Sequence, residues 1–167
     1  MDNLNTIGFG GGCHWCTEAV FMALKGVAKV EQGFIAPQGK LENLSEAVIV
    51  HYEKGVIELK DLVAIHLDTH RSTKKHAMRD KYRSAVYYFE DTDQFLLREI
   101  MLVLQQDFAE PIITEILPFG RFKSSDVQFL NYYFSDVKKP FCTTHISPKI
   151  DVLKKKYGEY LSTKLNN

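Results

Sequence analysis

The sequence predicts an α+β domain in which helices lie around a mainly antiparallel, mixed sheet. The chain has 167 residues, of which 45% are hydrophobic and 25% charged, enough apolar material for one sizeable core. Two stretches rich in β-formers, 27–36 and 45–53, flank a turn-like segment. Helical patterns occur before and after them, so both kinds of element are expected in one fold.

The elements follow one another without a linker long enough to divide the chain, so residues 1–167 are expected to form a single domain. The first strand ends in glycines, and the first helix is predicted to begin at Thr17, an acceptable N-cap, and to stop at Gly26. Two amphipathic helices are separated by the polar loop 68–81, and Pro148 marks the start of the last helix. Strands are expected at 4–10, 27–36, 45–53, 82–89 and 111–117, and helices at 18–25, 59–67, 92–108, 124–134 and 147–165.

The charge balance and the N-terminus exclude several function classes. Twenty-one basic side chains match twenty-one acidic ones, so the chain has no net field to hold a polyanion, and nucleic-acid binding is disfavoured. The first ten residues lack the pattern of a signal peptide, and no run approaches the length of a membrane span. Three cysteines do not suit a secreted disulfide framework. A cytoplasmic protein without membrane attachment is therefore expected.

The stretch GGGCHWCTEAVF carries the strongest chemical signal. Glycines before Cys13 allow a sharp turn with free amide groups, and the helix that follows presents the positive end of its dipole. Both features stabilise a thiolate and are expected to lower the pKa of Cys13. The alternative is that Cys13 and Cys16 are only small apolar residues at a turn.

Two further interpretations of this motif use the same cysteines. A zinc site would need two more Cys or His ligands at compact spacing, and no second C-x-x-C motif exists, so no metal site is predicted. A thioredoxin-like disulfide exchanger would use only Cys13 and Cys16, cycling between dithiol and disulfide. This second possibility remains open at the level of the motif.

The motif and the segments after it resemble the peptide methionine sulfoxide reductase A family, whose signature is Gly-Cys-Phe-Trp followed by Gly or Cys. Similar pieces follow in the family's order: SEAVIVHY, KYRSAVYY, ITEILPFGRF and KPFCTTHISPKIDVLKKKY. Together they cover most of the chain. The resemblance implies a two-layer, ferredoxin-like α+β sandwich and the reduction of methionine-S-sulfoxide.

The resemblance also assigns roles to residues of this chain. Cys13 matches the family's nucleophile, and Trp15 matches the aromatic residue that packs on the substrate methyl group. Glu46 matches the acid that protonates the sulfoxide oxygen, and a carboxyl buried in a strand is suited to donate a proton. Tyr82 matches a second hydrogen-bond donor to that oxygen. Cys142 matches the thiol that resolves the sulfenic acid, and it is expected to form the first disulfide with Cys13.

Several positions depart from the family pattern. His14 stands where the family has phenylalanine, so one wall of the substrate pocket becomes polar and gains a titratable group. The segment 36–45 is shorter than the family's and lacks its tyrosine. Ala77 occupies the position of a family aspartate, which Asp80 could replace only if its loop shifts. These changes affect residues expected to surround the substrate, so they predict an altered substrate specificity or rate.

The function expected from the resemblance is reduction of methionine-S-sulfoxide through a sulfenic acid and a disulfide. Thioredoxin or another dithiol would regenerate the thiols, and no metal or organic cofactor is implied. Cys16 would be a reserve or a second step in the thiol relay. Two alternatives remain: a disulfide exchanger using Cys13 and Cys16, and a catalytically silent module that binds oxidised methionine. A monomer is expected.

Overall fold

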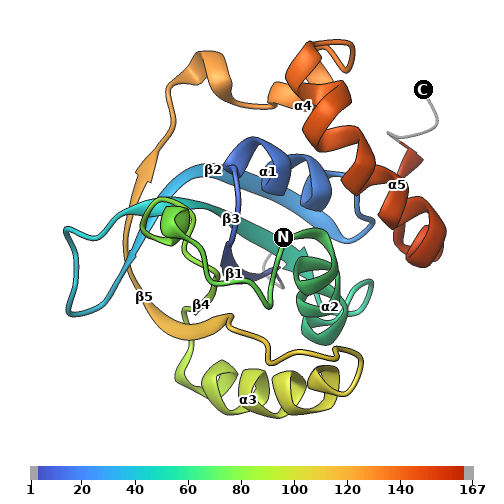
Figure 1. The fold of residues 1–167 in the computed structure, drawn as a ribbon. Coiled ribbons are helices and arrows are strands. Elements are labelled where there is room, and N and C mark those ends of the chain that lie inside the picture. The colour runs from blue at the N-terminus through green and yellow to red at the C-terminus, as the bar shows by residue number, and fades with distance from the viewer. Residues whose placement is uncertain (1–3, 164–167) are drawn as a thin grey trace.

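The computed structural model describes residues 4–163, which fold into a closed five-stranded β-barrel wrapped by helices (Figure 1). The strands are β1 (Leu4–Gly10), β2 (Val27–Pro37), β3 (Ser45–Glu53), β4 (Ala85–Tyr88) and β5 (Glu115–Ser124). The α-helices are α1 (His14–Met22), α2 (Leu59–Thr69), α3 (Asp91–Gln105), α4 (Tyr132–Ser135) and α5 (Ser147–Lys156). Short 3₁₀ turns and one π-helical turn, η3 (Cys142–Ile146), complete the path.

The barrel corrects the predicted fold class, because the sheet is closed and is not one layer of a ferredoxin-like sandwich. The strand order is β1-β3-β2-β5-β4, and β4 returns to pair with β1. β4 and β5 are parallel neighbours, whereas the other pairs are antiparallel. An open sheet has two edge strands, but here each strand has two partners. Pairing between strands far apart in sequence decides closure, and the residue pattern of a single strand does not reveal it.

β3 is buried on both faces, because the barrel has a filled interior and helices cover its outer face there. In β3, Ala47 and Ile49 belong to the inner cluster, whereas Val48 and Val50 belong to the large outer core with α1 and α2. The interior is narrow. A Cβ atom at Gly8 would lie 2.9 Å from the Ile35 side chain, so β1 needs a glycine there.

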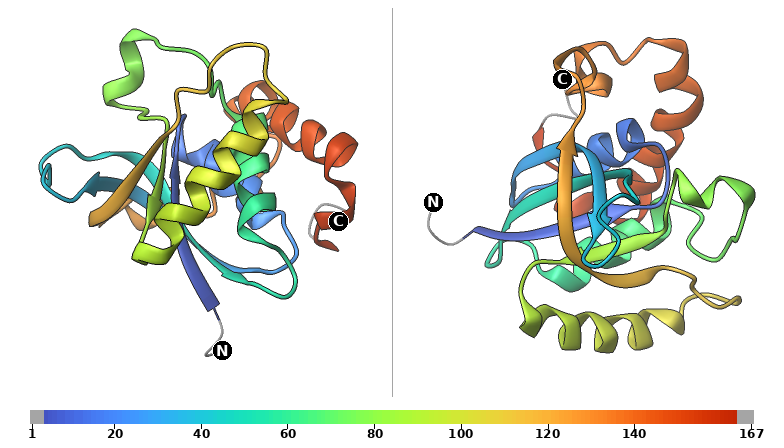
Figure 2. Two further views of the ribbon diagram at one scale, coloured as in Figure 1. Left: turned by 90° about the horizontal axis from the view of Figure 1, so that it is seen from below. Right: turned by 90° about the vertical axis from the view of Figure 1, so that its left-hand side faces the viewer.

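The helices divide the surface of the barrel. α1 packs on β1, β2 and β3 and is itself flanked by α4, α5 and η3, while α3 lies at the opposite side, along β4 and β5 (Figure 2). The C-terminal part of the chain therefore returns to the N-terminal helix. Within the described residues, no helix is long and apolar enough to span a lipid bilayer.

Several predicted boundaries were wrong. α1 begins at His14, because Cys13 has extended, non-helical backbone angles and its carbonyl accepts the amides of Cys16 and Thr17. β5 begins at Glu115, so most of the predicted strand at 111–117 is loop. The predicted helix at 124–134 reduces to a 3₁₀ turn and the four residues of α4. α5 ends at Lys156, and the end of its predicted range lies outside the described residues.

Candidate functional site

Cys13 lies at the rim of a cavity of about 460 Å³, at the point where β1 passes into α1. The cavity is lined by Gly11, Gly12, Cys13, Cys16, His70, Arg71, His76, Met78, Tyr82, Phe141, His145 and Lys149. Its size is within the range of small-molecule sites. Cys13 is half-buried, so its thiol is both held by the fold and reachable from the cavity.

The thiols of Cys13 and Cys16 form a hydrogen-bonded pair. The hydrogen bond from Cys13 lowers the pKa of Cys16, although burial acts in the opposite direction. The same hydrogen bond, together with burial, raises the pKa of Cys13. The first deprotonation of the pair therefore leaves its charge mainly on Cys16, contrary to the lowered pKa expected for Cys13. A proton shift from Cys13 to Cys16 would convert the more accessible of the two sulfurs to a thiolate.

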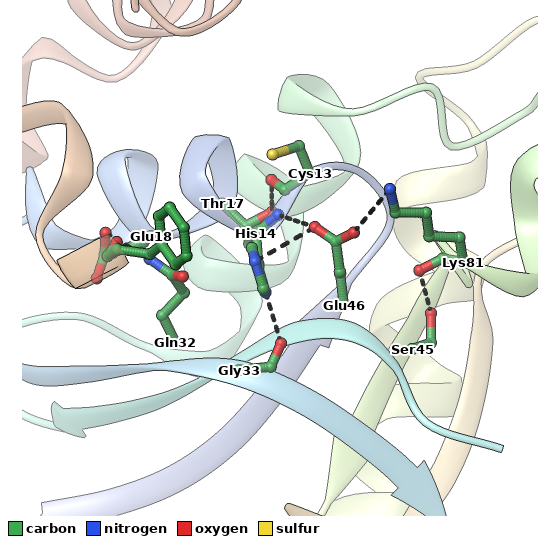
Figure 3. A network of polar contacts seen from close by, with 10 residues as sticks. Cys13, His14, Thr17, Glu18, Gln32, Gly33, Ser45, Glu46 and Lys81 are labelled. Carbon is green, nitrogen blue, oxygen red and sulfur yellow. Dashed lines mark hydrogen bonds and ion pairs between the residues drawn. The ribbon is translucent and has the colours of Figure 1, made fainter. Parts of the chain in front are cut away.

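Glu46 is buried beside the start of α1 (Figure 3). Its Oε1 accepts the backbone amide of His14 at 3.2 Å, and its Oε2 lies 3.6 Å from Lys81 Nζ. The backbone of Lys81 is tied to β3, because its carbonyl accepts the amide of Glu46 and the hydroxyl of Ser45. Glu46 is thus a buried carboxyl group close to Cys13.

His14 contacts Glu46 directly and does not form an apolar wall. Its Nδ1 is 2.7 Å from the carbonyl oxygen of Gly33 in β2, so Nδ1 carries a hydrogen and donates it there. The other ring nitrogen, Nε2, lies 3.4 Å from Glu46 Oε1. Both side chains are buried. This geometry places Nε2 beside the carboxyl group, a polar contact that phenylalanine in the same position cannot make.

Tyr82 lines the cavity with Cys13, and Arg79 holds it there. The Arg79 guanidinium donates to the carbonyls of Gly11, Tyr82, Arg71 and Lys74, at 2.9, 3.0, 2.6 and 3.0 Å. A single side chain therefore joins the glycine turn to the loop between α2 and β4. The sequence analysis did not single out Arg79, because nothing local in the sequence indicates which carbonyls it reaches.

Trp15 is covered by aromatic side chains from the C-terminal part of the chain. Its ring stacks on Tyr132 with a centroid distance of 4.1 Å, and Phe129 and Phe141 contact it at 5.5 and 5.2 Å. Trp15 does not line the cavity around Cys13, whereas Phe141 and Met78 do. The apolar side chains that line the cavity with Cys13 are therefore Phe141 and Met78, and not the predicted Trp15.

A buried carboxylate attaches the C-terminal segment to α1. Glu18 accepts the amides of Asn131 and Tyr132 at 2.9 and 3.1 Å, and Gln32 Nε2 at 3.0 Å. Burial raises the pKa of Glu18, which these hydrogen bonds partly oppose. The contacts hold Tyr132 against Trp15, and η3, which packs on α1, brings the buried thiol of Cys142 into electrostatic interaction with Cys16.

Asp80 lies apart from this arrangement. It is exposed at the end of the 3₁₀ turn Ala77–Asp80 and lines a neighbouring cavity with Arg79 and Arg83. Within residues 4–163, no three His, Cys, Asp or Glu side chains come close enough to hold a metal ion. The structure therefore brings together Cys13, Cys16, Glu46, His14 and Tyr82, but not Asp80.

The family model described as "Peptide methionine sulfoxide reductase" matches residues 5–161 of this chain. The chain belongs to this reductase family. Among curated relatives, a peptide methionine sulfoxide reductase MsrA from Pasteurella multocida is 33% identical over 90% of this chain and 95% of its own length. The matched residues include the cysteine motif, Glu46 and Cys142.

Solved structures agree with the reductase fold. Mxr1 from Saccharomyces cerevisiae in its reduced form superposes with a TM-score of 0.76 at 20% identity, over 86% of this chain and 92% of its own. Mxr1 in complex with Trx2 superposes with a TM-score of 0.63 at 23% identity, over 77% and 85%. The barrel is thus shared with known members at low sequence identity.

Two histidines support the glycine turn of this reductase from behind. His66 Nε2 donates to the carbonyl of Gly10 at 2.8 Å, and the His70 ring stacks on His66 at 4.1 Å. A Cβ atom at Gly11 would lie 2.4 Å from the His70 ring, so only glycine fits there. Burial lowers the pKa of His66, and it lowers that of His70 to about 3. Both rings are neutral near pH 7.

The neutral His70 predicts a loss of stability in acid. Its folded-state pKa is below the unfolded value of about 6.5, so its contribution is complete above pH 6.5 and is lost as pH falls towards 3. Between pH 7 and pH 5, the free energy of unfolding should fall by about 2 kcal/mol more in the wild type than in His70→Gln. Urea unfolding at the two pH values measures this difference. Equal losses in both proteins would contradict a buried neutral His70.

Proposed function

We propose that this family member reduces methionine-S-sulfoxide, free or in peptides and proteins, with Cys13 as the nucleophile. The observation that carries the proposal is the half-buried Cys13 thiol, in a cavity with Tyr82 and next to the buried Glu46–His14 pair. A sulfoxide accepts a thiolate well only when its oxygen is protonated. A nucleophile and a proton source are therefore both needed, and both are available within this small region.

In the proposed first step, the Cys13 sulfur attacks the sulfoxide sulfur while a proton passes to the oxygen. The oxygen ends on Cys13 as a sulfenic acid, and the methionine leaves as the thioether. Cys13 is oxidised by two electrons and the substrate is reduced by two. Glu46 donates the proton and Tyr82 orients the oxygen, while solvent supplies the proton that restores Glu46, beside which His14 Nε2 lies.

The substrate methyl group is proposed to lie against the apolar wall of Phe141 and Met78 in the conformation described. Trp15 keeps its proposed substrate-binding role, because it contacts Phe141 edge-on and supports that wall. A direct contact between Trp15 and the methyl group would require Tyr132 to leave the face of the indole.

The sulfenic acid then condenses with a thiol to give a disulfide and water. The family resemblance implies Cys142 as the first partner, but the interaction between the thiols of Cys13 and Cys16 favours Cys16. Cys142 interacts with Cys16 and could take over the disulfide by exchange, which frees Cys13. We propose the order Cys13 to Cys16, followed by Cys142.

This order predicts the first disulfide after one turnover. One equivalent of substrate, followed within seconds by thiol alkylation and trypsin digestion, should give a bond inside the peptide that contains both Cys13 and Cys16. At longer times the linkage should move to the peptide containing Cys142. A first product that already joins Cys13 to Cys142 would contradict the order and support the partner implied by the resemblance.

A dithiol reductant, thioredoxin or a similar protein, is proposed to complete the cycle. Mxr1, which shares this fold, has been crystallised in complex with Trx2. The chemistry of the proposed cycle requires no metal or organic cofactor. The balanced charge of the chain leaves no net field to hold a polyanion, which supports a protein that does not bind nucleic acid.

The assay that tests the function uses the separate S and R epimers of a blocked methionine sulfoxide, with dithiothreitol as reductant. We expect turnover of the S epimer and none of the R epimer. Reduction of neither epimer would refute the proposal. Because Cys13 and Cys16 are in contact, insulin disulfide reduction is measured in parallel, and robust activity that is indifferent to Glu46→Gln would indicate a disulfide exchanger.

A further inference from the structure

The cavity beside Cys13 has a marked excess of basic side chains. Its two cations are Arg71 and Lys149, His76 and His145 line it beside them, and none of its lining residues is Asp or Glu. The chain as a whole carries equal numbers of acidic and basic residues, so this concentration is local. A substrate that reaches Cys13 therefore enters a positively charged environment.

Arg71 is available to a ligand. No carboxylate among residues 4–163 forms an ion pair with its guanidinium, and its side chain is exposed at the cavity. Its backbone is fixed, because Arg79 donates to the Arg71 carbonyl at 2.6 Å. A guanidinium with a fixed backbone and no partner is suited to bind a carboxylate through two parallel hydrogen bonds.

Lys149, on α5, adds a second positive charge to the cavity that Arg71 lines. Its ammonium group extends from α5 to the carbonyl of Thr69 at the end of α2, where the helix dipole favours a cation. Burial lowers the pKa of Lys149, and the nearby charge of Arg71 lowers it further, whereas the interaction with Cys16 opposes this shift. An anion bound between Arg71 and Lys149 would relieve the repulsion between the two cations.

We propose that this part of the cavity is a carboxylate subsite, in which Arg71 and Lys149 bind a carboxylate of the substrate while Cys13 attacks its sulfoxide. The inference rests on the proposed function. In methionine, four bonds separate the sulfur from the carboxylate carbon, a span of at most about 6 Å. The carboxylate is the α-carboxylate of free methionine sulfoxide or the side chain of an acidic residue next to an oxidised methionine.

The experiment compares substrates that differ only in charge. N-acetyl-methionine-S-sulfoxide carries the carboxylate, and its methylamide does not. We expect KM for the acid to be about tenfold lower than for the methylamide, a difference that high salt weakens. Blocked peptides with Asp or Asn after the oxidised methionine form the second arm. A preference for the acid alone, or for the Asp peptide alone, identifies the source of the carboxylate.

Variants test whether Arg71 is responsible. Arg71→Gln should raise KM for the acid about tenfold and leave both constants for the methylamide within twofold. Lys75→Gln is the matched control, since Lys75 is an exposed cation of the same loop that lines other cavities. The proposal is overturned if the acid is not preferred over its methylamide and the Asp peptide is not preferred over the Asn peptide. It is also overturned if Arg71→Gln slows the reduction of all substrates alike. Reduction of none of the substrates would instead refute the proposed function.

Discussion

Cys13→Ser is expected to abolish methionine sulfoxide reduction, with a fall in kcat/KM of at least about 10³-fold. A serine hydroxyl is not ionised near neutral pH and cannot accept the oxygen as a sulfenic acid. The side chain at position 13 faces the cavity from the N-cap of α1, so the substitution leaves the helix start intact, and serine is itself a good N-cap. Steady-state reduction of the S epimer with dithiothreitol measures the loss.

Cys16→Ser is the matched control for this experiment. Cys16 is buried and is proposed to accept the proton of Cys13 before the attack, but its sulfur forms a bond only after the oxygen has been transferred. The Cys16→Ser protein should therefore still form one equivalent of methionine in a single turnover, and the Cys13→Ser protein should form none. A Cys13→Ser protein that keeps more than a tenth of the wild-type rate would show that another group attacks the sulfoxide.

Glu46→Gln is expected to slow sulfenic acid formation by about 10²- to 10⁴-fold, the usual contribution of general acid catalysis. Glutamine preserves the size of the side chain and can still accept the His14 amide, but it has no acidic proton to donate. Single-turnover formation of methionine, followed by quenching in acid, isolates this step from the later disulfide chemistry. Circular dichroism verifies that the fold is intact.

Glu42→Gln provides the control, because Glu42 is an exposed carboxylate in the turn before β3 and contacts none of the site residues described above. It should retain the wild-type rate. His14→Phe introduces the residue typical of the family and tests the contact between His14 and Glu46. In this variant the rate should still depend on Glu46, but the pH profile of the rate should change. A change of less than threefold in Glu46→Gln would transfer the acid role to His14.

Local features of the sequence were sufficient for the catalytic motif. Cys13, His14 and Cys16 lie within four consecutive residues, and the glycines before them and the helix after them are neighbours in the chain, so their proximity follows from short-range geometry. The strand pattern around Glu46 was compatible with a partly buried and with a solvent-facing carboxyl group, and the structure shows it buried. The family itself was recognisable from ordered motifs spread along most of the chain, which the family model later matched over residues 5–161.

Long-range contacts decided the rest. Barrel closure depends on the pairing of β4 with both β1 and β5, and no strand's own pattern specifies its neighbours. The pKa of Cys13 is raised and that of Cys16 is lowered by the hydrogen bond between their thiols. Which of the two is raised depends on the folded structure around both thiols.

The sequence by itself determined the cysteine motif and the reductase family, because those features are carried by residues close together or by their order. Only the tertiary structure decided that Tyr132 covers Trp15, that Asp80 faces a different cavity, and that Arg71 and Lys149 approach one active-site thiol pair. These contacts join residues up to more than a hundred positions apart. Their geometry depends on how α5 and the loop after α2 pack against α1, which no local pattern of residues encodes.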